Sequence, residues 1–350
     1  MANIRMISWN VQVFGPQKYA RTPNNEGVIW VIARLIRRAN ANIVVLMELT
    51  SSVCEQICYS VNEAIQRQTG NNWTYRAIPC RPNGDREAYG IFWQTDTNFA
   101  VINDAHNVNN VGLSSLQFPN NFSAINGRRA AIANFRTTDT NVNFAVSVYH
   151  APPNIRAIQG LEALAKSPRI YFVDNAGVVQ NVPTRLLGGD YNLDITTVAN
   201  YDWLEDPVPA PPPPTVVGEG AGTEPITLDE TEVITLTSGV NRWGPFPAGW
   251  SGNAYDYLHL RLDNIFVSSN VVSNGRILDM VELIMNPADS IRAIVQNFHL
   301  TYPGTANPAF PNAGILPPPL NVNLSHASCA WLLYRYAISD HYPLLAITTI

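Results

Sequence analysis

The 350-residue sequence has few charged residues, few cysteines and no excess of positive charge. Asp, Glu, Lys and Arg make up 14% of the chain, below the roughly 25% usual in globular domains. Hydrophobic residues make up 46%, which is enough for a core and excludes a disordered chain. The formal net charge of −5 gives no basic footprint for nucleic acid, and only a local groove of the molecule could be positive.

The cysteines and the apolar segments exclude two further classes of protein. Cys54, Cys58, Cys80 and Cys329 do not have the spacing of a zinc site, and the sequence does not decide whether they form disulfides. No apolar run is long enough to be a transmembrane helix. Residues 1–5 lead directly into a strand-like segment, so no signal peptide is expected. Both a cytoplasmic protein and one secreted without a signal, or after its removal, stay open.

The length allows one large α/β domain or two smaller ones. Polar motifs are spread over the full length and must come together in one site, so we expect a single domain over residues 1–350. Apolar periodicity predicts three helices, at residues 26–39, 53–68 and 155–165. Proline-rich insertions lie near residues 205–255 and 303–319 and are expected to be exposed loops.

Polar residues stand at, or next to, the ends of five strand-like apolar runs. A further polar cluster, Ser-Asp-His-Tyr-Pro, lies at residues 339–343. The ends of strands in an α/β sheet converge on the crevice where such folds usually place their chemistry. The polar residues of the five runs are Asn10, Glu48, His150, Asp190 with Asn192, and Asp263.

Six segments of the chain resemble the endonuclease/exonuclease/phosphatase superfamily, and they are most similar to deoxyribonuclease I and the cytolethal distending toxin B subunit. They occur in the family's order over nearly the whole chain, at residues 8–15, 45–48, 86–89, 150–152, 189–194 and 338–343. The resemblance implies an α/β fold in which two packed mixed β-sheets are flanked by helices, a four-layer sandwich.

Two departures from the family pattern concern the substrate more than the reaction. The nucleases carry an Arg that contacts DNA two positions after the metal-binding Glu, and here that position is Thr50. The segment between Asp194 and Asp263 has no counterpart in the family pattern.

Phosphodiester hydrolysis needs a cation on the phosphate, an activated water and help for the departing oxygen. Mg²⁺ prefers oxygen ligands and takes only one or two protein carboxylates. We expect Glu48 to be the principal ligand with Asn10 beside it, and Mn²⁺ or Ca²⁺ to be able to substitute or assist.

The resemblance also implies roles for two histidines. His341 is expected to be the general base, because a His near its ordinary pKa can take up a proton at neutral pH. Its orienting carboxylate is expected to be Asp340 or an equivalent residue. His150 is expected to be the acid that protonates the leaving oxygen, with Glu87 holding its imidazole.

The other matched residues are expected to bind the phosphate. Asp190 and Asn192 would polarise or position it, and Asp263 would complete an acidic floor. Arg128 or Arg129 would contact it, although surface charge at the start of a strand explains these two residues nearly as well.

We therefore predict a Mg²⁺-dependent endonuclease that cuts DNA and acts as a monomer. The alternative is a lipid phosphoesterase on the same fold, a sphingomyelinase or a phosphoinositide phosphatase. Thr50 favours that alternative. The aromatic segment at residues 242–250 could contact a membrane interface, stack on bases or cap the core. A catalytically inactive relative would have lost an essential residue, and the matched set is intact. A toxin role fits a nuclease but does not follow from the residues, which also identify no inhibitor or delivery partner.

Overall fold

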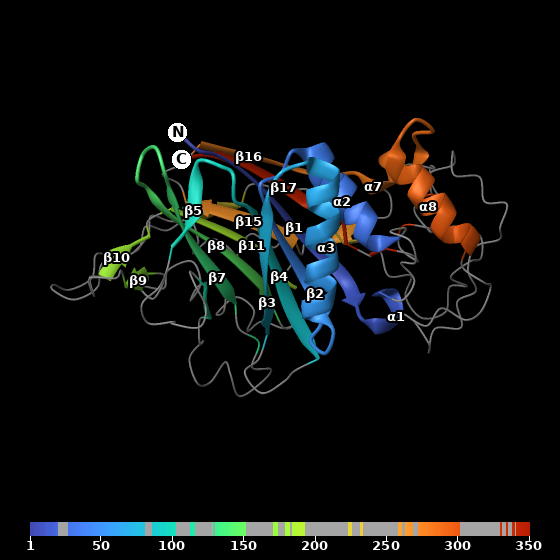
Figure 1. Ribbon diagram of the computed structural model, residues 1–350, viewed down its shortest axis with the longest axis horizontal. Coiled ribbons are helices and arrows are strands. Elements are labelled where there is room, and N and C mark those ends of the chain that lie inside the picture. Colours follow the sequence, from blue (N-terminus) through green and yellow to red (C-terminus); the bar gives the residue numbers. More distant parts are fainter. Residues whose placement is uncertain are drawn as a thin grey trace.

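The computed structural model shows two β-sheets packed face to face, with helices on the outside (Figure 1). Several expected features lie outside the described residues: the helix at 155–165, the loop at 303–319, most of the 205–255 insertion, and Arg129, Asp340 and Cys329. The structure describes residues 1–19, 27–80, 86–102, 113–115, 128, 130–151, 171–173, 179–182, 184–192, 223–225, 232–233, 258–260, 263–268, 272–301, 330, 334, 338–339 and 341–350.

The first sheet has six strands in the order β16-β17-β1-β2-β4-β3. Only the β1–β2 pair is parallel, and the other neighbours in this sheet are antiparallel. Its strands are β1 (Asn3–Phe14), β2 (Ile43–Thr50), β3 (Trp73–Pro79), β4 (Glu87–Gln94), β16 (Val272–Ile277) and β17 (Leu344–Thr349).

The second sheet has the order β12-β15-β11-β8-β7-β5, with β6 paired to β7. Here the β8–β11 pair is parallel. Its strands are β5 (Phe99–Val101), β6 (Leu113–Ser115), β7 (Ala131–Thr137), β8 (Asn143–His150), β11 (Thr184–Asp190), β12 (Thr223–Pro225) and β15 (Asp263–Ser268). Two further pairs join β9 (Tyr171–Val173) to β10 (Val179–Asn181), and β13 (Glu232–Val233) to β14 (Leu258–Leu260).

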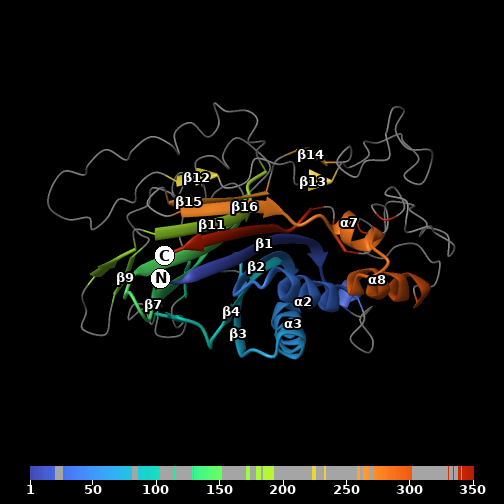
Figure 2. The same ribbon diagram turned by 90° about the horizontal axis from the view of Figure 1, so that it is seen from above.

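The described helices are α1 (Pro16–Tyr19), α2 (Val28–Ala39), α3 (Cys54–Thr69), α7 (Met280–Met285) and α8 (Ser290–Thr301). Seen from above, α2, α3, α7 and α8 lie on the side of the first sheet that faces away from β11 and β15 (Figure 2). The two expected helices that fall in the described part, at residues 26–39 and 53–68, are α2 and α3. The predicted sandwich of two mixed sheets with helices is confirmed.

Alternation along the strands divides the core into two layers. Successive side chains of a strand point to opposite faces. Ile7 and Trp9 of β1 therefore pack with α2, α3 and α7, whereas Ile4 and Met6 pack between the two sheets against residues such as Val146. Both faces of β2 are buried over residues 43–47, which explains its nearly continuous apolar sequence.

Two glycines allow β11 to lie close to its neighbours. A Cβ on Gly188 would come within 2.6 Å of the Met6 side chain and 2.9 Å of Ser8 Oγ. A Cβ on Gly189 would lie 2.3 Å from the carbonyl oxygen of Tyr149. Larger residues at these two positions would push β11 away from β1 and β8. The two glycines therefore allow the next residue, Asp190, to lie beside the end of β1.

The described cysteines, Cys54, Cys58 and Cys80, are buried thiols. Burial raises the pKa of Cys58 well above its ordinary value, so this thiol stays protonated and unreactive at neutral pH. In the described part of the chain, no helix has the length and hydrophobicity needed to span a bilayer.

Candidate active site

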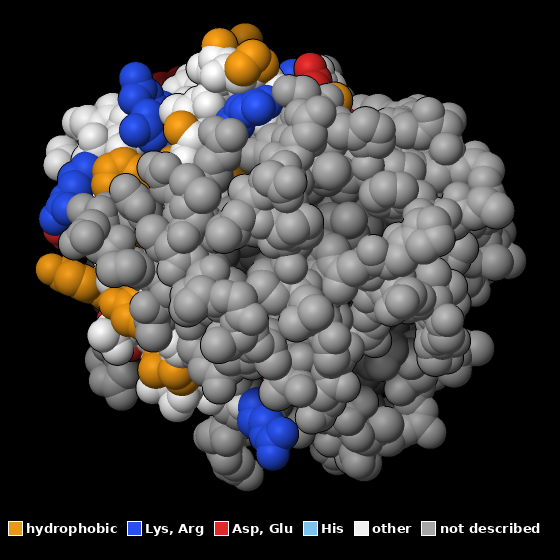
Figure 3. Space-filling view, turned by 90° about the vertical axis from the view of Figure 1, so that its right-hand side faces the viewer, with side chains coloured by type: hydrophobic (Ala, Val, Ile, Leu, Met, Phe, Trp, Pro, Cys, Tyr) orange, Lys and Arg blue, Asp and Glu red, His pale blue; other side chains and the backbone are white. Residues whose placement is uncertain are grey.

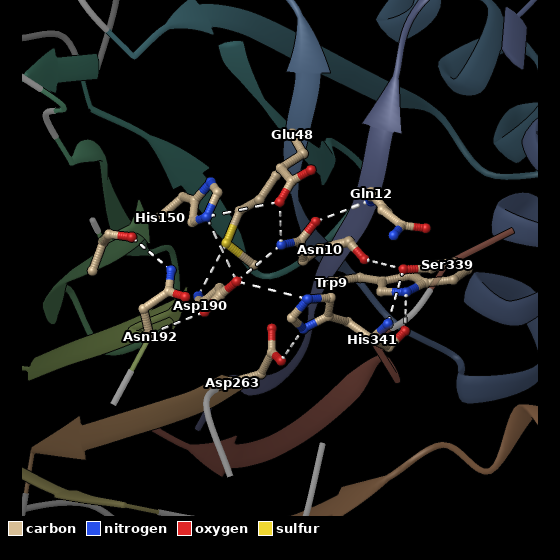
Figure 4. A network of polar contacts seen from close by, with 12 residues as sticks. Trp9, Asn10, Gln12, Glu48, His150, Asp190, Asn192, Asp263, Ser339 and His341 are labelled. Atoms are coloured by element: carbon tan, nitrogen blue, oxygen red, sulfur yellow. Dashed lines mark hydrogen bonds and ion pairs between the residues drawn. The ribbon is translucent and has the colours of Figure 1, made fainter. Parts of the chain in front are cut away.

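The site lies where the two parallel strand pairs end. In the ladders, Asn10 on β1 stands opposite Met47, the residue before Glu48, and Asp190 on β11 stands opposite His150 on β8. Asp263 begins β15 and is opposite Asp190. Carboxyl ends of neighbouring parallel strands meet at one edge of a sheet. Asn10 and Glu48 of the first sheet are therefore brought together with His150, Asp190 and Asp263 of the second (Figure 4).

A bulge at the end of β1 orients the side chains of Asn10 and Glu48. The register of β1 against β2 shifts after Asn10, and Gln12 and Val13 both have positive φ, 43° and 45°. The N–H of Gln12 donates to Asn10 Oδ1 (3.0 Å), and the N–H of Val13 donates to Glu48 Oε2 (2.9 Å). Glu48 itself has φ 60°. Such conformations cost about 1–3 kcal/mol each for non-glycine residues, and here they fix the side chains of Asn10 and Glu48.

Asn10 links the carboxylates of the two sheets. Its Nδ2 donates to Glu48 Oε1 and to Asp190 Oδ2, both at 2.9 Å. Because Oδ1 accepts the Gln12 N–H, the amide presents its nitrogen rather than its oxygen to the carboxylates. The sequence predicted Asn10 as a metal ligand beside Glu48. In this geometry it holds Glu48 and Asp190 together, and ligation through Oδ1 stays a prediction.

His150 is held by Glu87, as the sequence interpretation expected. Its Nδ1 lies 3.2 Å from Glu87 Oε2, and its Nε2 faces Glu48 Oε1 at 3.7 Å and Asp190 Oδ2 at 3.6 Å. Burial alone would lower the pKa of His150. The hydrogen bond to Glu87 and the charges of Asp190 and Glu48 outweigh burial and raise that pKa, which favours the imidazolium form.

Arg128 contacts Glu87, and its expected contact with a phosphate stays a prediction. Its guanidinium donates to Glu87 Oε1 (2.7 Å) and to the carbonyl oxygen of Ala151 (3.1 Å). Burial would raise the pKa of Glu87, but the contacts with His150 and Arg128 outweigh it and lower that pKa. The sequence interpretation gave Arg128 a phosphate contact. The structure shows an Arg–Glu–His chain in which Arg128 supports the carboxylate that holds His150.

Asn192 also fixes the backbone that follows His150. Its Nδ2 donates to the Ala151 carbonyl oxygen (2.7 Å), and its backbone N–H donates to Asp190 Oδ1 (3.0 Å). The amide expected to position a phosphate is thus engaged with the protein. A phosphate contact from Asn192 stays a prediction.

The carboxylate on His341 is Asp263. Asp263 Oδ2 lies 2.6 Å from His341 Nδ1, and both side chains are buried. The sequence interpretation placed Asp263 in an acidic floor and gave the orienting role to Asp340 or an equivalent, so Asp263 is that equivalent. Side chains of consecutive residues point in different directions, whereas Asp263 approaches His341 from another strand.

Four residues that the sequence interpretation did not single out hold the His341 segment in place. The indole N–H of Trp9 (3.0 Å) and the Tyr334 hydroxyl both donate to the His341 carbonyl oxygen. Ser339 Oγ donates to the Asn10 carbonyl oxygen (2.7 Å) and accepts the His341 N–H (3.1 Å). The buried Lys18 ammonium donates to the carbonyl oxygens of Val11, Gln12 and Ile338. The bulge and the His341 segment are therefore tied to each other.

Asp190 lies at the centre of the arrangement. Nε2 of His341 faces Asp190 Oδ2 at 3.9 Å, on the other side from His150 (Figure 4). Burial would raise the pKa of Asp190, but the charges of His341 and His150 and the N–H groups of Asn10 and Asn192 outweigh it and lower that pKa. Asp190 is therefore a carboxylate at neutral pH, although its side chain is only 3% exposed.

Comparison with known proteins gives the family. The model of the endonuclease/exonuclease/phosphatase family matches residues 7–341, a span that includes all of these site residues. The chain belongs to this family. Membership makes the protein a phosphoesterase. A search of curated proteins found no match.

Solved structures of endonuclease/exonuclease/phosphatase proteins share the fold at low identity. A family protein from Bacteroides vulgatus is 13% identical, with a TM-score of 0.53 and full coverage of both chains (100% and 100%). A mannosyl-6-phosphatase from Bacteroides thetaiotaomicron is 13% identical, with a TM-score of 0.50 over 99% of this chain and 100% of that one. The 2′,3′-cyclic phosphatase ANGEL2 is 10% identical, with a TM-score of 0.51 over 99% and 95%. At these identities the likeness concerns the fold alone.

The donor set of this family member fits a divalent metal ion. Glu48, His150 and Asp190 offer ligand atoms that lie within 4.8 Å of one another, and so do Asp190, Asp263 and His341. Three carboxylates face two imidazoles, so the cluster is negative overall even with both imidazoles protonated. A hard cation with oxygen ligands would offset this charge, and Glu48 and Asp190 supply such oxygens.

The strained bulge gives a prediction about stability. Val13 is β-branched, 54% exposed and in the left-handed region, which Asn adopts with less strain. Val13→Asn should raise the free energy of unfolding by about 0.5–1 kcal/mol in urea titrations, since the contact to Glu48 is made by the backbone. Val13→Ile keeps the branched Cβ and should leave that free energy unchanged. A loss of stability in Val13→Asn would show that the conformation is not strained.

Proposed function

We propose that the protein is a divalent-metal-dependent phosphodiesterase that hydrolyses DNA. One observation carries the proposal: two histidines, each held through Nδ1 by its own carboxylate, direct Nε2 to the same buried Asp190. Hydrolysis of a diester needs a proton acceptor on one side of the phosphorus and a proton donor on the other. Two positioned imidazoles can meet both needs.

His341 is suited to be the base. A proton on Nδ1 is shared with Asp263, so in the neutral imidazole Nε2 carries the free electron pair. Nε2 can then take a proton from a water molecule as the water oxygen attacks phosphorus. Asp263 fixes the tautomer and stabilises the imidazolium that forms, the role that carboxylates have in His-carboxylate pairs.

His150 is suited to be the acid. Its raised pKa favours the protonated ring, and Glu87 with Arg128 holds the ring in one orientation. The proton on Nε2 can pass to the oxygen that leaves as the P–O bond breaks. The alcohol product then departs neutral, and the proton taken up at His341 balances the one given by His150.

Glu48 and Asp190 would hold the metal ion through their carboxylate oxygens. When bound, a divalent cation neutralises charge on the phosphate oxygens and acts as a Lewis acid. The surrounding residues position these ligands, since the Asn10 amide and the bulge hold the two carboxylates at fixed positions before any substrate arrives.

The choice of DNA rests on sequence segments. Residues 8–15, Glu87 and residues 150–152 resemble the deoxyribonuclease form of the family motifs. Glu87 supports the choice of DNA further, because its carboxylate contacts Nδ1 of His150, the proposed acid, and can orient the imidazole ring. Proteins of the same fold include a mannosyl-6-phosphatase and a 2′,3′-cyclic phosphatase, so the substrate has to be tested directly.

The test is nicking of supercoiled plasmid in Mg²⁺, with sphingomyelin vesicles, a phosphoinositide and a sugar phosphate assayed in parallel. We expect the plasmid to be nicked in Mg²⁺, with loss of more than about 100-fold of the rate in EDTA. Restoring Mg²⁺ should restore nicking. Turnover of a lipid or a phosphomonoester without nicking would overturn DNA as the substrate while keeping the phosphoesterase. Equal rates in Mg²⁺ and EDTA would overturn the metal requirement.

A further inference from the structure

A pocket outside the candidate active site lies between the end of α2 and the start of α8. It has a volume of about 290 Å³ and is lined by Arg34, Arg37, Arg38, Asp289, Ser290 and Ile291. None of these residues takes part in the site described above. The pocket is near the lower end of the range of about 300–1,000 Å³ for ligand pockets.

The pocket is positively charged. Asp289 is the single acidic residue among the described residues that line it, and its carboxylate is already engaged twice. Its Oδ2 pairs with Arg38, and its Oδ1 accepts the N–H of Ile291 (2.9 Å). Arg34 and Arg37 make no hydrogen bond or ion pair with another described residue. Two positive charges are therefore left over, on a protein whose formal net charge is −5.

Arg34 is the residue that points to a ligand. Its Nε is buried and has no hydrogen-bond partner among the described residues, whereas buried polar groups nearly always have one. Its guanidinium lies 5.6 Å from the ring centroid of Trp30, a contact that restricts the side chain. The helix dipole accounts for basic residues in the last turn of α2, namely Arg37 and Arg38, but not for Arg34 one turn earlier.

The pocket is separate from the catalytic residues. The Arg5 guanidinium donates to the Ala39 carbonyl oxygen, so the end of α2 lies beside the start of β1. Asn10 is five residues further along that strand, which corresponds to about 17 Å.

Figure 3 shows the side of the molecule where α7 and α8 lie in Figure 1, and several Lys and Arg side chains gather toward the upper left of this face.

We propose that this pocket is a second anion site, which binds a phosphoryl group through Arg34 and Arg37. Guanidinium groups bind phosphate oxygens through paired, charge-assisted hydrogen bonds. The phosphoryl group can belong to a small phosphate ester or to a nucleic-acid backbone. The proposal does not depend on hydrolysis.

The test is calorimetric titration of the full chain with inorganic phosphate in EDTA. The double variant Arg34→Gln/Arg37→Gln should bind phosphate at least about tenfold more weakly than wild type. The control Arg67→Gln changes an exposed Arg of α3 that pairs with Glu63, and it should bind like wild type. His341→Asn should also bind like wild type.

Stability separates a binding role from a structural one. Without phosphate the double variant should be as stable as wild type or slightly more so, because like charges on neighbouring turns of a helix repel. Adding phosphate should raise the melting temperature of wild type and of Arg67→Gln, but not of the double variant. No saturable phosphate binding by wild type would overturn the proposal, and so would a loss of binding in His341→Asn alone.

A short DNA duplex in EDTA identifies the source of the phosphoryl group. Weaker duplex binding in the double variant, with unchanged binding in Arg67→Gln, would assign the pocket to a nucleic-acid backbone. Equal duplex binding in all variants, together with loss of inorganic phosphate binding in the double variant, would assign it to a small phosphate ester.

Discussion

His341→Asn should lower kcat for phosphoester hydrolysis by about 100- to 10,000-fold while the protein stays folded. The side-chain nitrogen of Asn lies near the position of His Nδ1, so it can still donate to Asp263. The variant therefore avoids a buried carboxylate without a partner, which would be strongly destabilising. The variant lacks Nε2, the atom that we expect to take a proton from the attacking water molecule. Steady-state kinetics and a thermal melt measure the two effects.

Asp263→Asn tests which carboxylate orients His341. If Asp263 orients His341, this variant should lose about 10- to 100-fold in kcat, the usual effect of removing a supporting carboxylate. Asp340→Asn should lose little. A large loss in Asp340→Asn with normal activity in Asp263→Asn would return the orienting role to Asp340.

Asp190→Asn should lower kcat/KM by about 100- to 1,000-fold, because it removes the charge on which both histidines and the metal site converge. The change is isosteric, so the fold should persist. The single amide oxygen can keep one of the two hydrogen bonds that Asp190 accepts, either from Asn10 Nδ2 or from the Asn192 N–H, and the other is lost. The variant should also need a higher Mg²⁺ concentration for half-maximal rate, since one carboxylate ligand is lost.

Asp96→Asn is the matched control, since Asp96 is exposed and away from the site. It should leave both kcat/KM and the Mg²⁺ dependence unchanged. A normal rate in Asp190→Asn at every Mg²⁺ concentration would exclude Asp190 from the chemistry. A lower rate that excess Mg²⁺ restores fully would confine its role to the metal.

The strands, and the residues at their ends, could be predicted from the sequence because the signal is local. Asn10, Glu48, His150 and Asp190 each follow an apolar run, and parallel pairing brings those ends together. The helices α2 and α3 were predictable for the same reason, since each has an apolar face of regular period.

The partners of the site residues could not be predicted in this way. The Asp263–His341 contact joins residues 78 positions apart, and Arg128 reaches Glu87 across 41 positions. Which long side chain meets which carboxylate depends on how two sheets pack, and no periodicity encodes it. The same holds for Lys18, whose ammonium is buried against three carbonyl oxygens although the sequence presents it as an ordinary charged residue.

Because β1 pairs with β17, the first sheet cannot be completed until the C-terminal residues of the chain have been synthesised. β1 leaves the ribosome before every other described strand, yet its antiparallel partner is residues 344–349. The indole of Trp9 likewise donates to the carbonyl oxygen of a residue 332 positions later. Until then β1 has one open edge, of the kind that invites pairing with other chains. His341, which we propose as the base, is synthesised in the same late stretch. A nascent chain therefore carries Glu48 and Asp190 long before His341, and the arrangement of these residues is complete only when β17 pairs with β1 in the first sheet.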